Sequence, residues 1–244
     1  MILDPMNLIR IMPAEELQAL INHPSPTAEG FFLRAIVFAN GEIRDLQGAK
    51  ELINPGDILI AADGGARFCR EMDLIPDILI GDLDSVSKKD EDYFQKAGTK
   101  ILKFEPRKDE TDLELALLHS LSLEIEQIII LGGLGRRWDH SLANLLLPAL
   151  PALDSLNISF WEEGQWIYLI RNEIEIKADR GSTLSLIPLG GDAEGVNTKG
   201  LEWPLIDETL VFGATRGLSN KVLQEKVSIK IKKGKLLCVY GAKD

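Results

Sequence analysis

Aspartates follow several of the short apolar runs in this sequence, and two of them are separated by a single residue. Asp82 and Asp84 come directly after the apolar run that ends at Gly81. If the chain stays extended there, both carboxylates point to the same side, where they repel each other unless a cation lies between them. Oxygen ligands of this kind suit Mg²⁺, which commonly leaves its other positions to water and phosphate oxygens. The pair therefore predicts a magnesium site, with the alternative that Asp84 or Ser85 caps the following helix.

Another aspartate, Asp63, precedes a pair of glycines, Gly64 and Gly65. Paired glycines let the backbone approach a ligand closely and expose its N–H groups. The same three residues also fit a tight turn in which Asp63 caps the next helix, and this segment alone does not decide between the two interpretations.

A third acidic segment runs from Lys108 to Glu114. Thr111 and Glu114 have the spacing of a capping box, which places Asp112 at the first helical position, where the helix dipole favours a negative charge. A structural role would be sufficient for these three residues. Lys108 and Asp109 add charges just outside the cap, at the same predicted edge of the sheet as the other aspartates.

Two arginines, Arg136 and Arg137, follow a glycine-rich turn that begins at Gly132. Planar guanidinium groups beside such a turn suit bidentate binding of phosphate. The alternative is a solvated arginine pair with Asp139 capping the next helix. The third glycine of a dinucleotide-binding turn is missing. Acidic residues at three strand ends and arginines at a fourth predict magnesium-assisted chemistry on a phosphorylated substrate.

The elements that must position these residues alternate between short apolar runs and amphipathic stretches. The apolar runs are residues 32–39, 58–62, 78–80, 101–104, 128–131 and 158–161. The clearest helical stretch, residues 112–123, places Leu113, Ala116, Leu117 and Leu121 on one face. Runs that are apolar on both sides and alternate with helices predict a mainly parallel sheet with helices on both faces. In such sheets, ligands bind at the carboxyl ends of the strands.

After about residue 166 the apolar residues recur with a period of two, as in antiparallel strands. Strands are expected at residues 173–177, 184–187 and 227–232, and the last is expected to form a hairpin with residues 236–240. The prediction is an α/β fold with three parts: an N-terminal extension (1–30), an α/β domain (31–165) and a small antiparallel β-domain (166–244).

Composition narrows the range of partners. The 244 residues contain 27 Lys and Arg against 38 Asp and Glu, a formal net charge of −11, which argues against a general affinity for nucleic acid or anionic membranes. No apolar run approaches the roughly 18–20 residues needed to span a bilayer, and the first residues do not resemble a secretory signal. The two cysteines are far apart and predict neither a disulfide nor a zinc site. We therefore expect a cytoplasmic protein.

Taken in order, these motifs resemble the thiamine pyrophosphokinase family. The matching segments are 63–66 (DGGA), 76–85 (PDILIGDLDS), 108–112 (KDETD) and 132–140 (GGLGRRWDH), and residues 185–189, 198–205 and 217–220 are similar to the family's C-terminal signature. The resemblance covers the chain from about residue 31 onward. It implies a nucleotide-binding domain followed by a thiamine-binding β-sandwich, a homodimer, and transfer of the terminal diphosphate of ATP to thiamine with release of AMP.

The resemblance also implies roles for residues of the first domain. Mg²⁺ and the polyphosphate would be held by Asp63, Asp82, Asp84 and Asp112. Arg137 would bind the phosphates, and Asp139 would lie in the same pocket. Arg136 stands where the family usually has a small residue, so which of the two guanidinium groups faces phosphate stays open. Asp112 and Asp84 are candidates for a general base, although a loose transition state does not require one.

In the second domain, the resemblance implies that Trp203, Ser219 and Asn220 help to form a thiamine pocket at the dimer interface, where an aromatic face can receive the cationic thiazolium. Two alternatives are a related diphosphokinase acting on another alcohol, such as a hydroxymethylpterin, and a non-catalytic sensor of nucleotide or thiamine. The C-terminal signature argues against the first, and the presence of every acidic residue argues against the second. A structural protein whose aspartates only cap helices is a third alternative.

Overall fold

A computed structural model describes residues 33–106 and 109–241 of the chain. The strands are β1 (Leu33–Phe38), β2 (Ile58–Ala62), β3 (Ile78–Gly81), β4 (Lys100–Lys103), β5 (Ile125–Leu131), β6 (Asn157–Glu162), β7 (Gln165–Ile170), β8 (Glu173–Lys177), β9 (Thr183–Pro188), β10 (Ala193–Lys199), β11 (Glu208–Leu210), β12 (Asn220–Lys221), β13 (Lys226–Lys230) and β14 (Leu236–Tyr240). The helices are α3 (Leu46–Glu51), α4 (Ala66–Glu71), α5 (Lys88–Ala97), α6 (Asp112–Ser120) and α7 (Trp138–Leu146), with 3₁₀ turns η2 (Asp63–Gly65), η3 (Leu121–Leu123), η4 (Leu147–Ala149) and η5 (Pro151–Leu153). The predicted N-terminal extension lies outside the described residues. None of the described helices is both long and apolar enough to cross a lipid bilayer.

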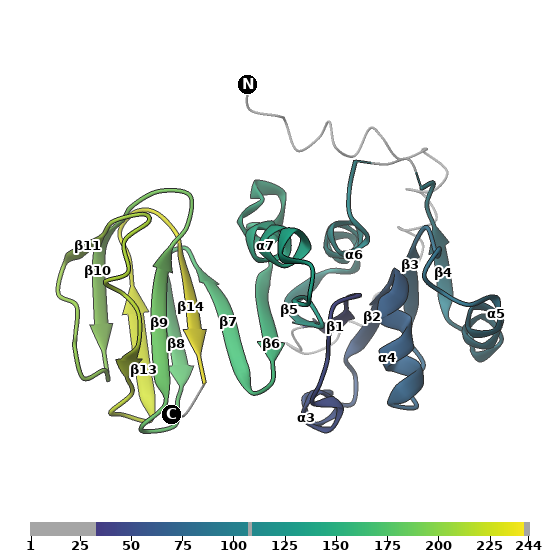
Figure 1. Cartoon of the computed structure of the whole chain (residues 1–244), viewed down its shortest axis with the longest axis horizontal. Helices are drawn as coiled ribbons and strands as arrows, with labels where there is room; N and C mark the ends of the chain where they lie inside the picture. Colours follow the sequence, from purple (N-terminus) through teal and green to yellow (C-terminus); the bar gives the residue numbers. More distant parts are fainter. Residues whose placement is uncertain (1–32, 107–108, 242–244) are drawn as a thin grey trace. The chain divides into compact units, whose positions relative to one another are not determined.

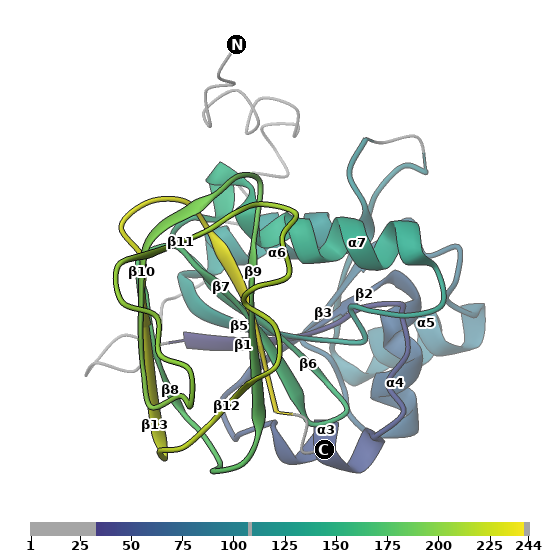
Figure 2. The ribbon, with the colours of Figure 1, turned by 60° about the vertical axis from the view of Figure 1, so that its left-hand side comes forward.

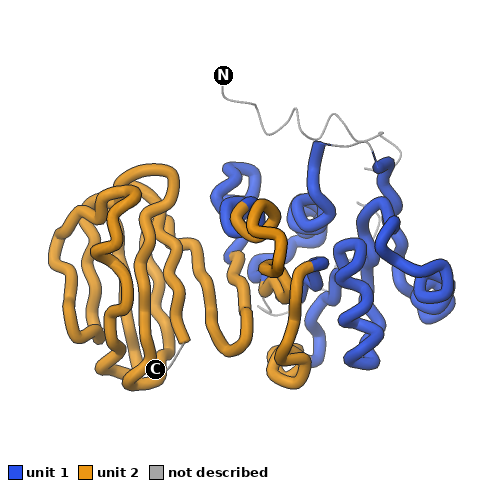
Figure 3. The backbone as a smooth tube through the Cα atoms, viewed as in Figure 1, with its two compact units in different colours: residues 1–40, 55–128, 143–157 blue, residues 41–54, 129–142, 158–244 orange. Residues whose placement is uncertain are grey.

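The chain forms two compact units, each built from more than one segment (Figure 3). Unit 1 consists of residues 1–40, 55–128 and 143–157, and unit 2 of residues 41–54, 129–142 and 158–244. Strands β1 to β4 belong to unit 1, and strands β6 to β14 belong almost wholly to unit 2.

The strands of unit 1 form a parallel sheet. β1, β2, β3 and β4 are hydrogen-bonded in that order (Figure 1). Residues 35–38 of β1 and 59–62 of β2 are buried in succession, so both faces of these strands are covered. Helices α4 and α6 pack against them. The predicted mainly parallel sheet covered by helices is therefore confirmed.

Helix α6 begins at Asp112, as predicted, and becomes the 3₁₀ turn η3 at Leu121. Leu113, Ala116 and Leu117 are buried against the sheet. Leu121, which was expected on the same face, is 37 % exposed. This expectation was wrong because the tighter 3₁₀ winding rotates later side chains away from the face that an α-helix would continue.

Unit 2 is an antiparallel β-sandwich. One of its sheets has the order β12-β9-β14-β7-β6 and the other β11-β10-β13-β8, and Figure 2 shows the two side by side. Leu186 and Cys238 from the first sheet share one core with Val196 and Ile229 from the second. The predicted β-sandwich is thus confirmed.

The predicted hairpin between β13 and β14 is wrong. β13 pairs with β8 and β10, whereas β14 pairs with β7 and β9. β14 is buried at four of its five positions and suits the interior of the larger sheet, while β13 alternates between buried and exposed residues. The connection at residues 231–235 therefore passes from one sheet to the other, a choice made by burial rather than by the turn residues.

A buried histidine predicts acid-sensitive stability. His119 on α6 is 6 % exposed, and its Nε2 has no hydrogen-bond partner among the described residues. Burial lowers the pKa of His119 to about 4, and the charge of Lys100 acts in the same direction. Between about pH 6.5 and pH 4 the unfolded chain binds a proton at this residue more readily than the folded chain. The free energy of unfolding should therefore fall by up to about 3 kcal/mol as the pH decreases through this interval.

Urea unfolding of the wild type and of His119→Gln at about pH 7 and about pH 4.5 tests this expectation. The variant should lose less stability on acidification, because its side chain does not titrate. His140→Gln, which changes an exposed histidine, should behave as the wild type. Equal losses for all three proteins would show that His119 does not cause the acid sensitivity.

Candidate active site

Asp63 follows β2 and opens the 3₁₀ turn η2, which leads into α4. Its φ of 44° lies in the left-handed region, which aspartate tolerates better than most residues. The side chain is 4 % exposed, and Oδ1 accepts a hydrogen bond from the Ser85 amide at 3.3 Å. Neither η2 nor α4 has a side-chain cap. The alternative in which Asp63 caps the next helix is therefore wrong, and its carboxylate is turned toward the loop after β3.

The paired glycines let this turn lie directly on the end of β1. A Cβ atom at Gly65 would be 2.0 Å from the carbonyl oxygen of Phe38, and one at Gly64 would be 2.4 Å from Oδ1 of Asn40. Any larger residue would collide at both positions. The two glycines are therefore required for close packing of the turn against the end of β1. Their contact with a ligand through exposed N–H groups stays a prediction.

The chain after β3 turns instead of staying extended. Oδ1 of Asp82 accepts a hydrogen bond from the Asp84 amide at 3.2 Å, and the intervening Leu83 has a φ of 64° with a buried side chain. An aspartate that bonds to the backbone two residues later forms a turn. The expectation of an extended chain was therefore wrong: Asp84 is exposed and accepts from the Ser85 hydroxyl at 2.9 Å.

Helix α5 begins after Ser87, whose hydroxyl oxygen accepts the amide of Asp90 at 3.1 Å. The alternative in which Asp84 or Ser85 caps this helix is consequently wrong. The aspartates of the preceding turn have no capping role in α5.

The N-terminus of α6 contains the predicted capping box. The Thr111 hydroxyl oxygen accepts the Glu114 amide at 3.2 Å, and the Glu114 carboxylate bonds in return to the backbone of Thr111. Burial raises the pKa of Glu114, and the charge of Glu110 adds to the effect. The box fixes the start of the helix at Asp112, while Asp109 is exposed just before it. Lys108 lies outside the described residues.

These local structures bring three carboxylates of unit 1 together. Asp63, Asp82 and Asp112 each place one oxygen within 4.8 Å of the other two. A Cβ atom at Gly81 would be 3.0 Å from the Asp63 Cβ and from Oδ1 of Asp112, so glycine leaves the room that they need. Asp84 is not part of this group.

The group suits a magnesium ion. All three donors are carboxylate oxygens, the ligands that Mg²⁺ prefers, and two ligands of one such ion are at most about 4.2 Å apart, twice the metal–oxygen distance. Side-chain rotations that shift these oxygens by less than about 1 Å would therefore bring all three onto one ion. Asp63, Asp82 and Asp112 are accordingly the candidate metal ligands that the fold assembles.

In unit 2, each arginine of the glycine-rich turn is paired with a carboxylate. Arg136 donates from Nε to Glu42 at 2.7 Å, and Arg137 donates to both oxygens of Asp139 at 2.5 and 3.3 Å. The hydrogen bond from Arg137 lowers the pKa of Asp139. Both guanidinium groups are largely exposed, and exposed ion pairs contribute little to stability. A phosphate group could replace either carboxylate at small cost.

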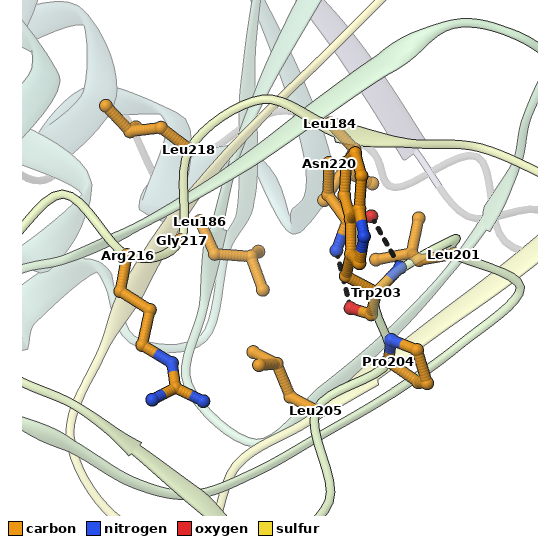
Figure 4. Close-up of a pocket in the computed structure, with 10 residues that line it drawn as sticks. All are labelled: Leu184, Leu186, Leu201, Trp203, Pro204, Leu205, Arg216, Gly217, Leu218 and Asn220. Atoms are coloured by element: carbon orange, nitrogen blue, oxygen red, sulfur yellow. Dashed lines mark hydrogen bonds between the residues drawn. The ribbon is translucent and has the colours of Figure 1, made fainter.

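A pocket of about 200 Å³ lies within unit 2 and is lined mainly by leucines (Figure 4). Trp203 and Asn220 both line it and are joined by two hydrogen bonds. The side-chain Nδ2 of Asn220 donates to the backbone carbonyl of Trp203 at 2.7 Å, and the backbone N–H of Trp203 donates to Oδ1 of Asn220 at 3.1 Å. The adjacent Ser219 has a φ of 58° and donates its amide to the Ser185 hydroxyl at 3.0 Å. Two of the three predicted thiamine-site residues thus share a pocket.

Asn40, two positions after the end of β1, was not foreseen as a site residue. Its side chain accepts from the Arg67 guanidinium and donates to the Ser85 hydroxyl at 3.5 Å. It therefore connects the turn after β2 with the turn after β3. The signal was available, because Asn40 occupies the same position after its apolar run as Asp63 does after the next one.

Comparison with known proteins identifies the family. Residues 49–158 match the family described as "Thiamin pyrophosphokinase, catalytic domain", and residues 171–236 match "Thiamin pyrophosphokinase, vitamin B1 binding domain". The chain is 31 % identical over 196 residues to thiamine pyrophosphokinase 1 of Arabidopsis thaliana. The aligned region covers 70 % of this chain and 73 % of that protein. The chain belongs to the thiamine pyrophosphokinase family.

Other members of this family support the assignment. The chain is 27 % identical over 182 residues to the thiamine pyrophosphokinase of Bacillus subtilis (strain 168), with coverage of 74 % of this chain and 85 % of that protein. A crystal structure of thiamine pyrophosphokinase from Bacillus subtilis superposes with a TM-score of 0.76 at 26 % identity, covering 86 % of this chain and 99 % of the other. The chain is thus an enzyme with the family's activity, a thiamine diphosphokinase.

The capping box makes a prediction about stability. Thr111→Ala should lower the free energy of unfolding by about 1 kcal/mol, because the Glu114 amide loses its acceptor. Thr111→Ser keeps the hydroxyl and should leave the free energy of unfolding nearly unchanged, because serine caps a helix at least as well as threonine. Urea unfolding of the three proteins measures the difference, and equal losses in the two variants would show that the cap does not stabilise α6.

Proposed function

We propose that the chain transfers diphosphate from ATP to thiamine with Mg²⁺ held by Asp63, Asp82 and Asp112. The observation that carries this proposal is the approach of three carboxylate oxygens to within 4.8 Å of one another. When bound, Mg²⁺ would offset the negative charge of the polyphosphate during transfer. We retain Asp84 as a further proposed ligand, on the strength of the family resemblance.

In the proposed reaction the hydroxyl oxygen of thiamine attacks the β-phosphorus of ATP in line. The new bond joins that oxygen to the β-phosphorus, the bond from the β-phosphorus to the oxygen bridging to the α-phosphorus breaks, and AMP leaves with its electron pair. The hydroxyl proton passes to solvent or to a carboxylate, for which Asp112 and Asp84 are the candidates. Positioning of the two substrates and electrostatic stabilisation would supply most of the acceleration.

We propose that nucleotide contacts come from residues that border these carboxylates in the sequence and from the glycine-rich turn of unit 2. The proposed set is Gly64, Gly65, Lys108, Asp109, Thr111, Arg136, Arg137 and Asp139. Arg137 is the preferred phosphate ligand, because the family resemblance falls on it and its exposed pair with Asp139 is readily exchanged.

Thiamine is proposed to bind at Trp203, Ser219 and Asn220. The pocket in unit 2 is lined by leucines, an indole ring and Arg216, whose charge is paired with Glu208 at 2.9 Å (Figure 4). The leucines suit the apolar body of thiamine, and the face of the indole ring suits its positive charge. The match of residues 171–236 to a vitamin B1 binding domain supports thiamine over a pterin alcohol.

We further propose that the enzyme acts in the cytoplasm as a homodimer. In the sequence, the proposed catalytic domain (31–165) is followed by the proposed thiamine-binding domain (166–244). Large apolar side chains are exposed on unit 2, among them Trp203 at 59 %, Ile206 at 77 % and Phe212 at 57 %. Exposed apolar residues of this kind commonly mark a protein interface, which supports the dimer.

Replacement of a single carboxylate tests the proposed metal site. Asp82→Asn should abolish AMP formation that depends on thiamine and divalent metal, and should leave the fold intact because the amide oxygen can still accept the Asp84 N–H. Asp73→Asn makes the same change of charge at an exposed turn residue of unit 1 with a φ of 56° and should retain activity. Near-normal AMP release by Asp82→Asn would refute the metal assignment.

The thiamine pocket predicts a selective effect on one substrate. Trp203→Ala should raise the KM for thiamine about tenfold, because the cation loses its aromatic face, and should leave the KM for ATP unchanged. Trp203→Phe retains a ring and should have a smaller effect. Tyr93→Ala, which removes an exposed aromatic ring from α5 of unit 1 and does not touch the pocket, serves as a control. Steady-state kinetics with each substrate varied in turn would reveal a different site if Trp203→Ala changed both constants equally.

A further inference from the structure

Glu162, at the end of β6, is bonded to the backbone of the glycine-rich turn in unit 2. The Leu134 amide donates to Glu162 Oε1 at 3.1 Å, and the Gly133 amide also bonds to this carboxylate. The side chain is only partly exposed. One carboxylate therefore binds two consecutive N–H groups of the segment that leads to the two arginines.

The rest of this turn is held mainly by backbone and hydroxyl groups. The Gly41 amide donates to the Gly132 carbonyl at 2.8 Å, the Glu42 amide donates to the Leu134 carbonyl at 2.8 Å, and the Ser141 hydroxyl bonds to both the amide and the carbonyl of Gly135. None of these contacts to the turn's backbone changes its charge with pH. Glu162 is therefore the titratable side chain among these contacts to the backbone of the turn.

Packing leaves the turn little freedom to find another partner. A Cβ atom at Gly133 would be 2.7 Å from the ring of Phe160, two residues before Glu162 on the same strand. If Glu162 stopped accepting these hydrogen bonds, the Gly133 and Leu134 amides would lose their acceptor in a closely packed turn, which is unfavourable for polar groups that are shielded from water.

We propose that Glu162 is a positioning residue whose carboxylate holds the Gly133–Leu134 backbone, and thereby sets the affinity of the arginine turn for the phosphates of ATP. This inference rests on the proposed function of that turn. A carboxylate offers acceptor oxygens to both amides, whereas a protonated carboxyl uses one oxygen as a donor. The hold on the turn should therefore weaken when Glu162 binds a proton.

The environment of Glu162 raises its pKa, so the carboxylate binds a proton near neutral pH. Burial raises the pKa of Glu162 to about 7, more than the two backbone bonds lower it, and Glu163 on the same hairpin adds to the rise. The charged groups of the neighbouring segments are Glu42 and Arg44 from residues 41–54 and Arg136 from the turn itself. The pKa of Glu42 is lowered by its bonds to these two arginines, so Glu42 keeps its charge while Glu162 titrates.

Glu162→Gln provides the test, because an amide offers one acceptor and one donor and so imitates the protonated carboxyl. The KM for ATP should be measured from about pH 6 to about pH 8.5 in both proteins. The ratio of the variant's KM to that of the wild type should rise about three- to tenfold as the pH increases through about 7, the size expected for the net contribution of one hydrogen bond. Taking the ratio cancels the titration of ATP, and the KM for thiamine should not follow it.

Glu163→Gln removes the same charge from the neighbouring exposed residue and should follow the wild type, apart from a small shift of the midpoint. A constant KM ratio for Glu162→Gln across the pH range would overturn the proposal.

Amide hydrogen exchange of residues 132–137 without substrates gives a readout that does not depend on activity. After correction for intrinsic rates, wild-type protection should decrease below about pH 7, and the Gln variant should show the low protection at every pH. Unchanged wild-type protection across this range would also overturn the proposal, even if the variant failed to fold. A wild type that forms no thiamine-dependent AMP would instead contradict the proposed function and leave the exchange experiment as the test of Glu162.

Discussion

Mutual repulsion among three carboxylates is the interaction that the structure of unit 1 must overcome. Asp63, Asp82 and Asp112 hold their oxygens within 4.8 Å of one another, a distance at which like charges destabilise the folded chain. Each is kept in place by a local device: a left-handed backbone at Asp63, a side-chain-bonded turn at Asp82, and the start of a capped helix at Asp112. The parallel strands set the positions of these devices, and a bound cation would turn the repulsion into attraction.

Unit 2, in the part of the chain that the structure describes, contains an apolar pocket instead of a cluster of carboxylates. Its pocket is formed by leucines around Trp203, whose backbone is fixed by the side chain of Asn220. No comparable cluster of acidic groups is found in the described residues of this unit. The acidic cluster thus lies in unit 1 and the apolar pocket in unit 2, while the arginine turn adds exposed positive charge to unit 2.

The sequence predicted what depends on local patterns. β2 and β8 match the expected ranges 58–62 and 173–177, and the capping box fixes the start of α6 as its spacing indicates. The wrong predictions concern features that depend on contacts with residues far away in the sequence. The partner of β14 depends on which sheet can bury it, and the turn at Asp84 depends on a buried position for Leu83. Glu162 was not foreseen for the same reason, since its partner is 28 positions earlier in the chain.

The position of β14 between β7 and β9 has a consequence for biosynthesis. β7 is complete at Ile170, but its partner begins only at Leu236. A growing polypeptide therefore carries β7 with an open edge while residues 171–235 are added. The same holds for β9, which is complete at Pro188, while residues 189–235 are added. Unpaired apolar edges promote association between chains, so the β-sandwich is most exposed to such association until β14 has been synthesised and inserted between β7 and β9.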